Sequence, residues 1–150
     1  MPNVVRRRVI DTPVESMWAL VSDPYHLPRW WPRAVRVENV RQSSGKKRSQ
    51  WTTVLTTDAG RTVRADFRCL SSATNERFVW EQELADTPFE RILRSWVLEI
   101  HLEPSDDGTE VELRSRQALR GLSRLGSPMM RRATGRKLTE ALDGLEDAVA

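Results

Sequence analysis

The C-terminal stretch, residues 127–150, carries the pattern that most constrains how this chain folds. Ser127 is a favourable N-cap, and Pro128 suits the first position of a helix. Small and apolar side chains then recur at helical spacing on one face: Met130, Thr134, Leu138, Ala141, Leu142, Leu145 and Val149. The basic side chains fall in the first half of this segment and the acidic ones in the second, so the charges oppose the helix macrodipole. We therefore expect a long helix that is held by packing of its apolar face on a large surface.

The rest of the chain provides that surface as short segments in which apolar and polar side chains alternate. The predicted strands are residues 4–11, 34–42, 50–57, 62–70, 77–84, 90–103 and 110–119. Turn sequences at residues 43–46, 58–60 and 106–108 join several of them. Such alternation indicates an antiparallel sheet with one solvated face, and strands joined in sequence by short turns form a meander. We expect this meander to curl around the C-terminal helix.

Two short helices are predicted between the first two strands. Residues 12–15 have the sequence of a capping box that begins the first helix. Asp23 and Pro24 end this helix and cap the second. The second helix carries Trp30 and Trp31, which suit core packing. Because two adjacent side chains point in different directions, we expect one of this pair to line a pocket or its mouth.

Composition and charge restrict the class of protein. The net charge of +3 is the difference between 24 basic and 21 acidic side chains, a mixed surface that argues against a nucleic-acid partner. Apolar runs are too short to span a bilayer, and the N-terminus lacks the apolar core of a signal peptide, so we expect no integral membrane association. Cys69 is alone, which excludes an intramolecular disulfide. We expect one cytoplasmic domain over residues 1–150.

The sequence contains no evident catalytic or metal-binding arrangement. We expect His101 to be solvated, because it alternates with the apolar Ile100 and Leu102, and His26 to lie at the surface or at a pocket mouth. No group of His, Asp and Glu has the spacing of metal ligands, and no glycine-rich loop suggests phosphate binding. We therefore expect no metal and no cofactor, and we assign no catalytic residue.

Polar side chains interrupt the apolar face of several predicted strands. Arg94 falls on the same face as Trp96 of its strand. It either reaches water at the open end of the strand or faces a cavity, where a guanidinium group binds a ligand oxygen. Gln82, Ser115 and Gln117 interrupt neighbouring strands in the same way. Several such groups on adjacent strands suggest a polar end to an apolar pocket.

The first half of the predicted C-terminal helix contains residues that could leave room for a cavity. Arg131 falls within its apolar sector, and the residues that follow, Ala133, Thr134 and Gly135, are small. Small side chains beneath a curled sheet either leave room for a cavity or permit close approach of the helix to the sheet. Both interpretations of Gly135 remain open at this point.

Four segments carry a resemblance to the START-like (SRPBCC) superfamily, in the polyketide cyclase/dehydrase branch of small bacterial proteins. They read IDTPVESMW at residues 10–18, SDP at 22–24, LPRWWP at 27–32 and GTEV at 108–111. The resemblance implies an α+β helix-grip fold of the Bet v 1 type: a seven-stranded antiparallel sheet curled around a long C-terminal helix, with two short helices after the first strand. It also implies a hydrophobic cavity between sheet and helix. Members include cyclases, lipid carriers, hormone receptors and co-chaperones, so fold alone does not assign function.

We interpret the chain as a binding domain for a hydrophobic or aromatic small molecule, polyketide-like or lipid-like, held between the sheet and the C-terminal helix. Alternatives are a cofactor-independent cyclase or dehydratase acting on a bound poly-ketone and, less favoured, a co-chaperone-type interaction domain. Six tryptophans exceed what a compact core of this size needs, so we expect several of them to contact the cavity. The candidate ligand-binding residues are Trp30, Trp31, Trp51, Phe67, Trp80, Gln82, Arg94, Trp96, Leu113, Ser115, Gln117, Met130, Arg131 and Thr134.

Overall fold

The computed structural model describes residues 3–41, 49–57, 59–85, 87–91, 93–121 and 127–150. Its elements in chain order are β1 Asn3–Ile10, α1 Val14–Val21, the 3-10 helix η1 Pro24–His26, α2 Leu27–Trp30, β2 Ala34–Arg41, β3 Gln50–Thr56, β4 Thr62–Ala73, β5 Arg77–Gln82, the 3-10 helix η3 Pro88–Arg91, β6 Leu93–Ser105, β7 Gly108–Leu119 and α3 Ser127–Val149. The predicted turn at residues 43–46 and position 58 of the next turn lie outside the described residues.

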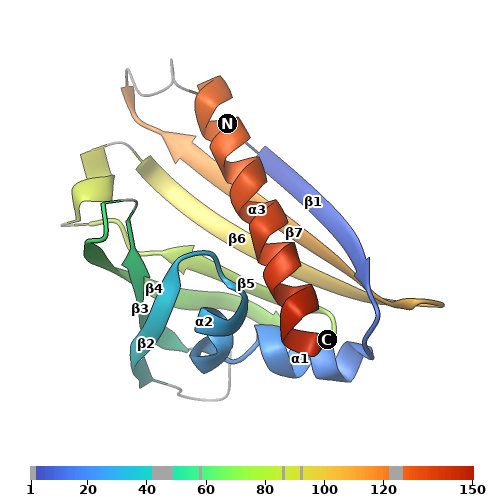
Figure 1. The fold of residues 1–150 in the computed structure, drawn as a ribbon. Coiled ribbons are helices and arrows are strands. Elements are labelled where there is room, and N and C mark those ends of the chain that lie inside the picture. Colours follow the sequence, from blue (N-terminus) through green and yellow to red (C-terminus); the bar gives the residue numbers. More distant parts are fainter. Residues whose placement is uncertain (1–2, 42–48, 58, 86, 92, 122–126) are drawn as a thin grey trace.

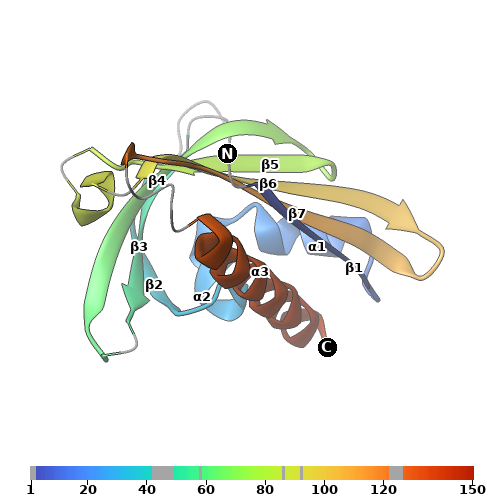
Figure 2. The ribbon, with the colours of Figure 1, turned by 90° about the horizontal axis from the view of Figure 1, so that it is seen from above.

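The seven strands form one antiparallel sheet in the order β1-β7-β6-β5-β4-β3-β2. Strands β2 to β7 are therefore a meander, and β1 pairs with β7 at one edge (Figure 1). Seen from above, the sheet is strongly curved and α3 lies on its concave side (Figure 2). This arrangement confirms the predicted α+β architecture, a curled antiparallel sheet around the C-terminal helix.

The contact between β1 and β7 fixes where the first helix begins. A Cβ atom at Gly108 would lie 2.1 Å from the Ile10 carbonyl oxygen, so only glycine fits this approach. Next to it, the buried Thr109 hydroxyl donates a 2.8 Å hydrogen bond to the Thr12 carbonyl oxygen. Thr12 is thereby tied to β7, and α1 starts two residues later, at Val14, with Pro13 at the N-cap and no side-chain hydrogen bond to cap it. The predicted capping box is therefore wrong, whereas the predicted cap at Asp23 is present, accepting from the Tyr25 N–H at 3.0 Å.

Helix α3 packs on the sheet through the predicted apolar face. Leu138, Ala141 and Leu145 are completely buried, and Leu142 is 2% exposed. Burial of a leucine side chain of this size stabilises a fold by about 1.5–3 kcal/mol. The helix therefore owes its stability to this interface rather than to its own sequence, as its unfavourable charge order suggests.

The acidic C-terminal half of α3 is explained by its neighbours. Arg8 of β1 contacts both Asp143 and Glu146, with its Nη1 atom 2.6 and 2.5 Å from their carboxylate oxygens. Arg29 of α2 donates to the Ala148 carbonyl oxygen at 3.1 Å, near the end of the helix. These cations from other elements offset the acidic side chains that oppose the macrodipole.

One glycine lets α3 approach the rest of the molecule closely. A Cβ atom at Gly144 would lie 2.4 Å from the Trp30 carbonyl oxygen, so the C-terminal half of α3 lies directly on α2. A Cβ atom at Gly135 would meet only the end of the Arg6 side chain on β1. Gly135 therefore faces β1 and does not line the pocket, and no backbone atom requires a glycine there. Among the described helices, none is long and apolar enough to cross a membrane.

Candidate ligand-binding site

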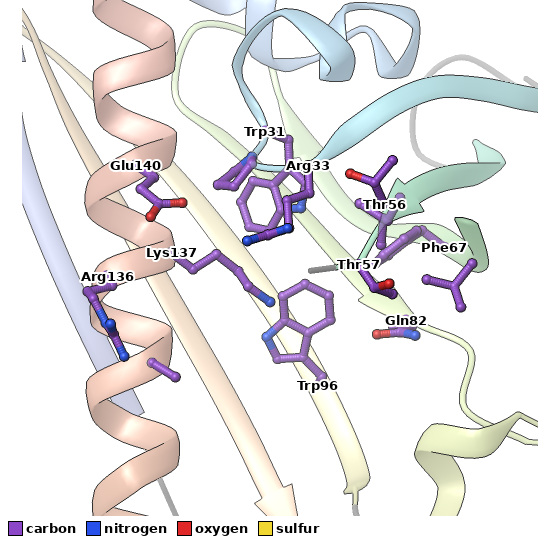
Figure 3. Close-up of a pocket in the computed structure, with 14 residues that line it drawn as sticks. Trp31, Arg33, Thr56, Thr57, Phe67, Gln82, Trp96, Arg136, Lys137 and Glu140 are labelled. Atoms are coloured by element: carbon purple, nitrogen blue, oxygen red, sulfur yellow. The ribbon is translucent and has the colours of Figure 1, made fainter. Parts of the chain in front are cut away.

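A pocket of about 520 Å³ opens between α3, the segment after α2 and the curled half of the sheet (Figure 3). Strands β3 to β6 provide one side, and the first half of α3 provides the other. The lining residues are Trp31, Pro32, Arg33, Leu55, Thr56, Thr57, Val63, Phe67, Gln82, Trp96, Ala133, Arg136, Lys137 and Glu140.

Three aromatic side chains form the apolar wall of this pocket. The ring centroids of Trp31 and Trp96 are 6.2 Å apart, and those of Phe67 and Trp96 are 5.8 Å apart. All three side chains are buried to more than nine-tenths of their surface. Trp80 lies behind them, edge-on to both Trp31 and Phe67 at 5.7 and 6.2 Å. The wall is therefore a rigid part of the core, with one surface facing the pocket.

The remaining predicted tryptophans form a second layer that does not line the pocket. Trp30 and Trp51 contact Trp80 with ring centroids 6.1 and 5.7 Å away. The Nε1 atoms of Trp30, Trp51 and Trp80 are buried without a hydrogen-bond partner in the described structure. These rings are therefore held by aromatic packing, and their contribution to a ligand site is to support Trp31 and Phe67.

The polar residues predicted on β7 hold the wall and the helix in place instead of lining the pocket. The indole N–H of Trp96 donates to the Ser115 hydroxyl at 2.8 Å, with both side chains buried. The Thr134 hydroxyl of α3 donates to the Gln117 side-chain oxygen at 3.3 Å. Leu113 on the same strand is completely buried. Of the predicted polar group, Gln82 is the member that lines the pocket.

Arg94 does not belong to this pocket. Its side chain is exposed, and it is absent from the lining. The pairing of β6 with β7 shifts register between Leu93 and Ser95. A bulge breaks the alternation of side chains, so Leu93, at 8% exposure, takes the inner side next to Trp96. The prediction that strand alternation turns Arg94 toward the helix is therefore wrong.

The first turn of α3 also differs from the prediction. Arg131 is exposed and does not line the pocket, and Met130 is half-buried against the core. The pocket instead receives the side of the helix that carries Ala133 and Lys137, one turn apart. This side flanks the apolar stripe, so the pocket lies between α3 and the sheet, next to the apolar contact that holds them together.

Lys137 is the most distinctive residue that the sequence prediction missed. Its Nζ atom lies 5.7 Å from the centroid of the Trp96 ring, within the range of a cation–π contact. The side chain is solvent-accessible but surrounded by the pocket walls, and this desolvation lowers the pKa of Lys137, opposed by the charge of Glu140 and reinforced by that of Arg33. The signal in the sequence was its place three residues after Thr134, at the border of the apolar face.

Arg33 reaches the pocket from a strained backbone position. Its φ of 65° lies in the left-handed region, which costs a non-glycine residue about 1–2 kcal/mol. The Arg33 carbonyl accepts a 3.0 Å hydrogen bond from the Thr56 N–H, and the Ala34 N–H donates to the Trp31 carbonyl at 3.2 Å. These bonds hold the reversal between α2 and β2 and turn Arg33 toward Lys137 and Glu140 (Figure 3).

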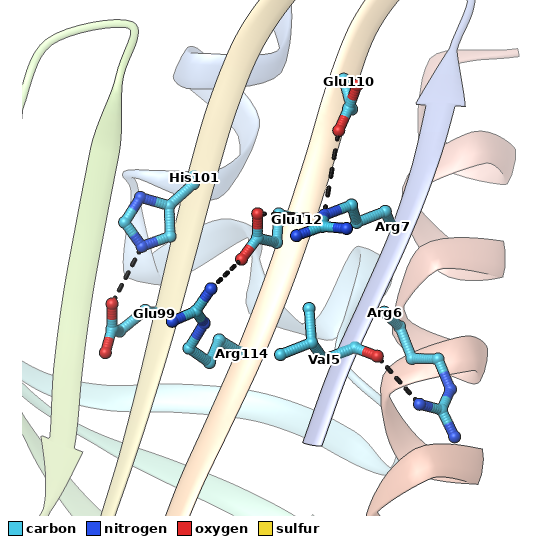
Figure 4. Close-up of polar contacts among 8 residues, drawn as sticks. All are labelled: Val5, Arg6, Arg7, Glu99, His101, Glu110, Glu112 and Arg114. Atoms are coloured by element: carbon cyan, nitrogen blue, oxygen red, sulfur yellow. Dashed lines mark hydrogen bonds and ion pairs between the residues drawn. The ribbon is translucent and has the colours of Figure 1, made fainter. Parts of the chain in front are cut away.

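The histidines lie elsewhere. His101 is on the outer face of the sheet, where its Nε2 atom is 2.9 Å from a carboxylate oxygen of Glu99 (Figure 4). The Nδ1 atom of His26 lies 3.1 Å from the Ala19 carbonyl oxygen. In the part of the chain that the structure describes, no group of three or more His, Cys, Asp and Glu side chains is placed to hold a metal ion.

A curled seven-stranded antiparallel sheet that holds a long C-terminal helix, with a pocket between them, defines the helix-grip fold of START-like proteins. A family model described as "Polyketide cyclase / dehydrase and lipid transport" matches residues 1–150. The chain belongs to this family, as the resemblance in its first third implied.

Several solved structures share this fold. A START superfamily protein from Mycobacterium smegmatis has a TM-score of 0.78 and 16% identity, over 97% of this chain and 94% of that one. Two di-domain ARO/CYC proteins are also similar: StfQ from the steffimycin biosynthetic pathway (TM-score 0.80, 11% identity, 97% of this chain) and BexL from the BE-7585A biosynthetic pathway (TM-score 0.81, 20% identity, 99% of this chain). This chain spans 50% of StfQ and 46% of BexL, about half of each. A search of curated proteins found no match.

Proposed function

We propose that this chain binds a hydrophobic or aromatic small molecule, polyketide-like or lipid-like, in the pocket between α3 and the sheet, and that residues 1–150 are a single START-like ligand-binding domain. The observation that carries the proposal is the exposure of an aromatic wall to an open space of about 520 Å³. Volumes of this order are typical of small-molecule sites, which are mostly apolar with a few placed polar groups. Membership of the family supports the same class of ligand.

The aromatic wall of Trp31, Phe67 and Trp96 is held rigidly, which is typical of a preformed binding site and not of a chance surface hollow. Trp96 is fixed by Ser115, and Trp31 is fixed by its contacts with Trp80. A ligand that meets rings already in place loses little side-chain entropy from the protein, so more of its apolar burial appears as affinity. The threonine hydroxyls of Thr56 and Thr57 add neutral polar groups for orientation.

A second candidate function is cyclisation or dehydration of a bound poly-ketone. The observation that favours it is the presence of Lys137 and Glu140 in the pocket lining, an amine and a carboxyl group one helical turn apart. Such groups can exchange protons with a bound substrate. Two ARO/CYC proteins share the fold, which makes this chemistry worth testing. At 11% and 20% identity, the likeness itself shows only the fold.

A blocked pocket tests the binding proposal. Ala133 is exposed and lines the pocket, so Ala133→Phe places a ring in the open space. Ala19 is exposed on α1 and outside the lining, so Ala19→Phe is a matched control. We expect the neutral fluorophore N-phenyl-1-naphthylamine to bind the wild-type chain and Ala19→Phe with low-micromolar affinity, on the order of −8 kcal/mol, and Ala133→Phe at least tenfold more weakly.

Two results would contradict the proposal. The first is equal affinity of the fluorophore for both variants, which would place it outside this pocket. The second is an absence of binding by the wild-type chain to a panel of apolar compounds of varied shape. Identification of small molecules that co-purify with the chain, by native mass spectrometry, then separates carriers of a ligand from catalysts that turn it over.

A further inference from the structure

Basic side chains outnumber acidic ones among the residues that line the pocket. Among its lining residues Arg33, Arg136 and Lys137 are basic, and Glu140 is acidic. Glu140 acts on Lys137 through its charge and makes no hydrogen bond to it. These side chains reach solvent, and their excess positive charge attracts an anion that enters the space and repels a cation. The pocket is therefore suited electrostatically to a ligand that carries negative charge.

Lys137 brings a positive charge to the aromatic wall. Its side chain extends from α3 across the pocket and ends over the Trp96 ring, 5.7 Å from the centroid (Figure 3). An ammonium group has three N–H donors, and a ring face occupies only one side of it. Because Lys137 lines the pocket, its other donors can meet an oxygen of a ligand whose ring system lies against the same wall.

The neutral polar groups lie on the other side of Trp96. Thr57 and Gln82 come from the β3 and β5 side of the pocket, away from α3 (Figure 3). A bound molecule would thus meet cations toward the helix, aromatic rings beneath it and neutral donors and acceptors toward the strands. This polarity orients a ligand that has one charged end and a flat apolar body.

We infer that the pocket selects aromatic ligands that bear an anionic oxygen, a carboxylate or a phenolate, and that Lys137 binds this oxygen above Trp96 while the ring system packs on Trp31 and Phe67. The inference rests on the proposed function and narrows it to a class of ligand. Arg33 contributes positive potential to the same space, as its effect on Lys137 indicates. Lys137 is thereby a specificity-determining residue of the binding site.

The test compares two probes of the same shape by titration calorimetry near neutral pH. 2-Naphthoate carries the anionic oxygen, and 2-naphthamide is its neutral counterpart. Lys137→Met removes the ammonium group and keeps an apolar chain. We expect this variant to lose about tenfold to a hundredfold in affinity for 2-naphthoate, the range for a hydrogen bond to a charged group, and to bind 2-naphthamide within about twofold of wild type.

Arg132→Met is the matched control. Arg132 is exposed on the same helix and lies outside the pocket lining, so its loss changes the net charge equally. We expect it to bind both probes like the wild-type chain. Equal weakening of 2-naphthoate binding by both methionine variants would mean that net charge alone attracts the anion, which would overturn the inference. Should Lys137→Met fold poorly, Lys137→Gln is expected to give the same result.

The outcomes separate the inference from the proposal beneath it. If Lys137→Met weakens both probes equally, or if wild type prefers 2-naphthamide, the selection of an anionic oxygen is wrong and binding in the pocket stands. If neither naphthyl probe binds while N-phenyl-1-naphthylamine does, the inference again fails alone. If no apolar probe binds the wild-type chain, the proposed function fails, and the inference with it.

Discussion

The indole N–H of Trp96 on β6 donates a hydrogen bond to the Ser115 hydroxyl on the neighbouring β7, 2.8 Å away and out of contact with water. The two side chains approach from adjacent strands of the same inner face. This bond fixes the orientation of the ring that lines the pocket and lies beneath Lys137. The same hydrogen bond therefore contributes to the packing of the core and to the shape of the candidate ligand site.

Removal of this hydroxyl should affect both stability and binding. Ser115→Ala leaves the buried indole N–H without an acceptor, so we expect a loss of about 1–3 kcal/mol in the free energy of unfolding. A less constrained Trp96 should also weaken binding of N-phenyl-1-naphthylamine. Chemical denaturation and fluorescence titration measure the two effects. Ser115→Thr, which keeps a hydroxyl, is the control and should recover both; a Ser115→Ala protein with unchanged stability would contradict this role.

The two glycines on α3 should respond oppositely to alanine. At Gly144 the new Cβ meets the Trp30 backbone at 2.4 Å, and a backbone cannot move aside cheaply. We expect Gly144→Ala to destabilise by about 1–3 kcal/mol, the usual cost of overpacking. At Gly135 the contact is the end of the Arg6 side chain, which can rotate away. We therefore expect Gly135→Ala to stabilise the fold by up to about 1 kcal/mol, because alanine has the higher helix propensity. Thermal melting of both variants checks the difference in sign.

Glu112 on the outer face of the sheet should raise the free energy of unfolding at neutral pH, and this contribution should be lost in acid. Burial raises the pKa of Glu112, but hydrogen bonds from Arg114 (2.7 Å) and Arg7 (3.2 Å) outweigh it, and the pKa of Glu112 is lowered from 4.5 (Figure 4). A carboxyl group with a lowered pKa stabilises the folded chain above its unfolded pKa and loses this contribution as the pH falls through the folded value.

Glu112→Gln tests this assignment. Because both arginine partners are partly exposed, we expect the variant to be less stable by only about 0.5–1 kcal/mol near neutral pH. The difference from wild type should shrink as the pH falls below 4.5 and vanish once Glu112 is protonated in the folded chain. Urea denaturation across this range measures it. A difference that persists in strong acid would assign the effect to packing.

Lys137 should show the opposite dependence on pH. Desolvation lowers the pKa of Lys137 from 10.5, so the folded chain binds fewer protons than the unfolded chain between the lowered value and 10.5. The residue therefore destabilises the fold below the lowered pKa, and this effect disappears as the pH approaches 10.5. We expect Lys137→Met to be at least as stable as wild type near neutral pH, with an advantage that decreases in alkali. Arg132→Met should show no such trend; an advantage constant with pH would contradict the assignment.

Binding of an aromatic anion should follow the same titration. Only the protonated Lys137 offers a positive charge, and the carboxylate of 2-naphthoate stays ionised from neutral pH upward. Affinity for 2-naphthoate should therefore decrease as the pH rises through the lowered pKa of Lys137, whereas affinity for 2-naphthamide should not. Calorimetry at a series of pH values measures both. A parallel decrease for the two probes would indicate a change in the protein rather than loss of the ammonium charge.

The sequence by itself determined the elements whose apolar side chains recur at a regular spacing. The apolar period over residues 127–149 predicted α3, and the alternating segments predicted the seven strands and their meander. These patterns can be recognised because secondary structure imposes its period locally, and a face that packs into a core is mostly apolar. Four motif segments were sufficient to indicate the family.

Strand alternation failed where a strand contains a bulge. Counting back from Trp96 puts Arg94 on the inner face, but the register shift between Leu93 and Ser95 reverses the parity. Arg94 is exposed, which agrees with the other interpretation made from the sequence, that it reaches water. Asn39, with φ of 54°, lies at a similar irregularity between Glu38 and Arg41 of β2. A bulge depends on how a strand pairs with its neighbour and on the curvature of the sheet, and neither can be predicted from the residues of one strand.

Only the tertiary structure decided which charged side chains join the aromatic residues of the pocket. Arg33 reaches it through a strained turn and Lys137 through one side of α3, and these positions are far apart in the chain. On the sequence alone Lys137 is one more charge at the border of an amphipathic helix, and such charges ordinarily face water. The packing of α3 on the curled sheet brings Trp96 beneath it, and that contact depends on the pairing of β6 with β7 and on the curvature of the sheet.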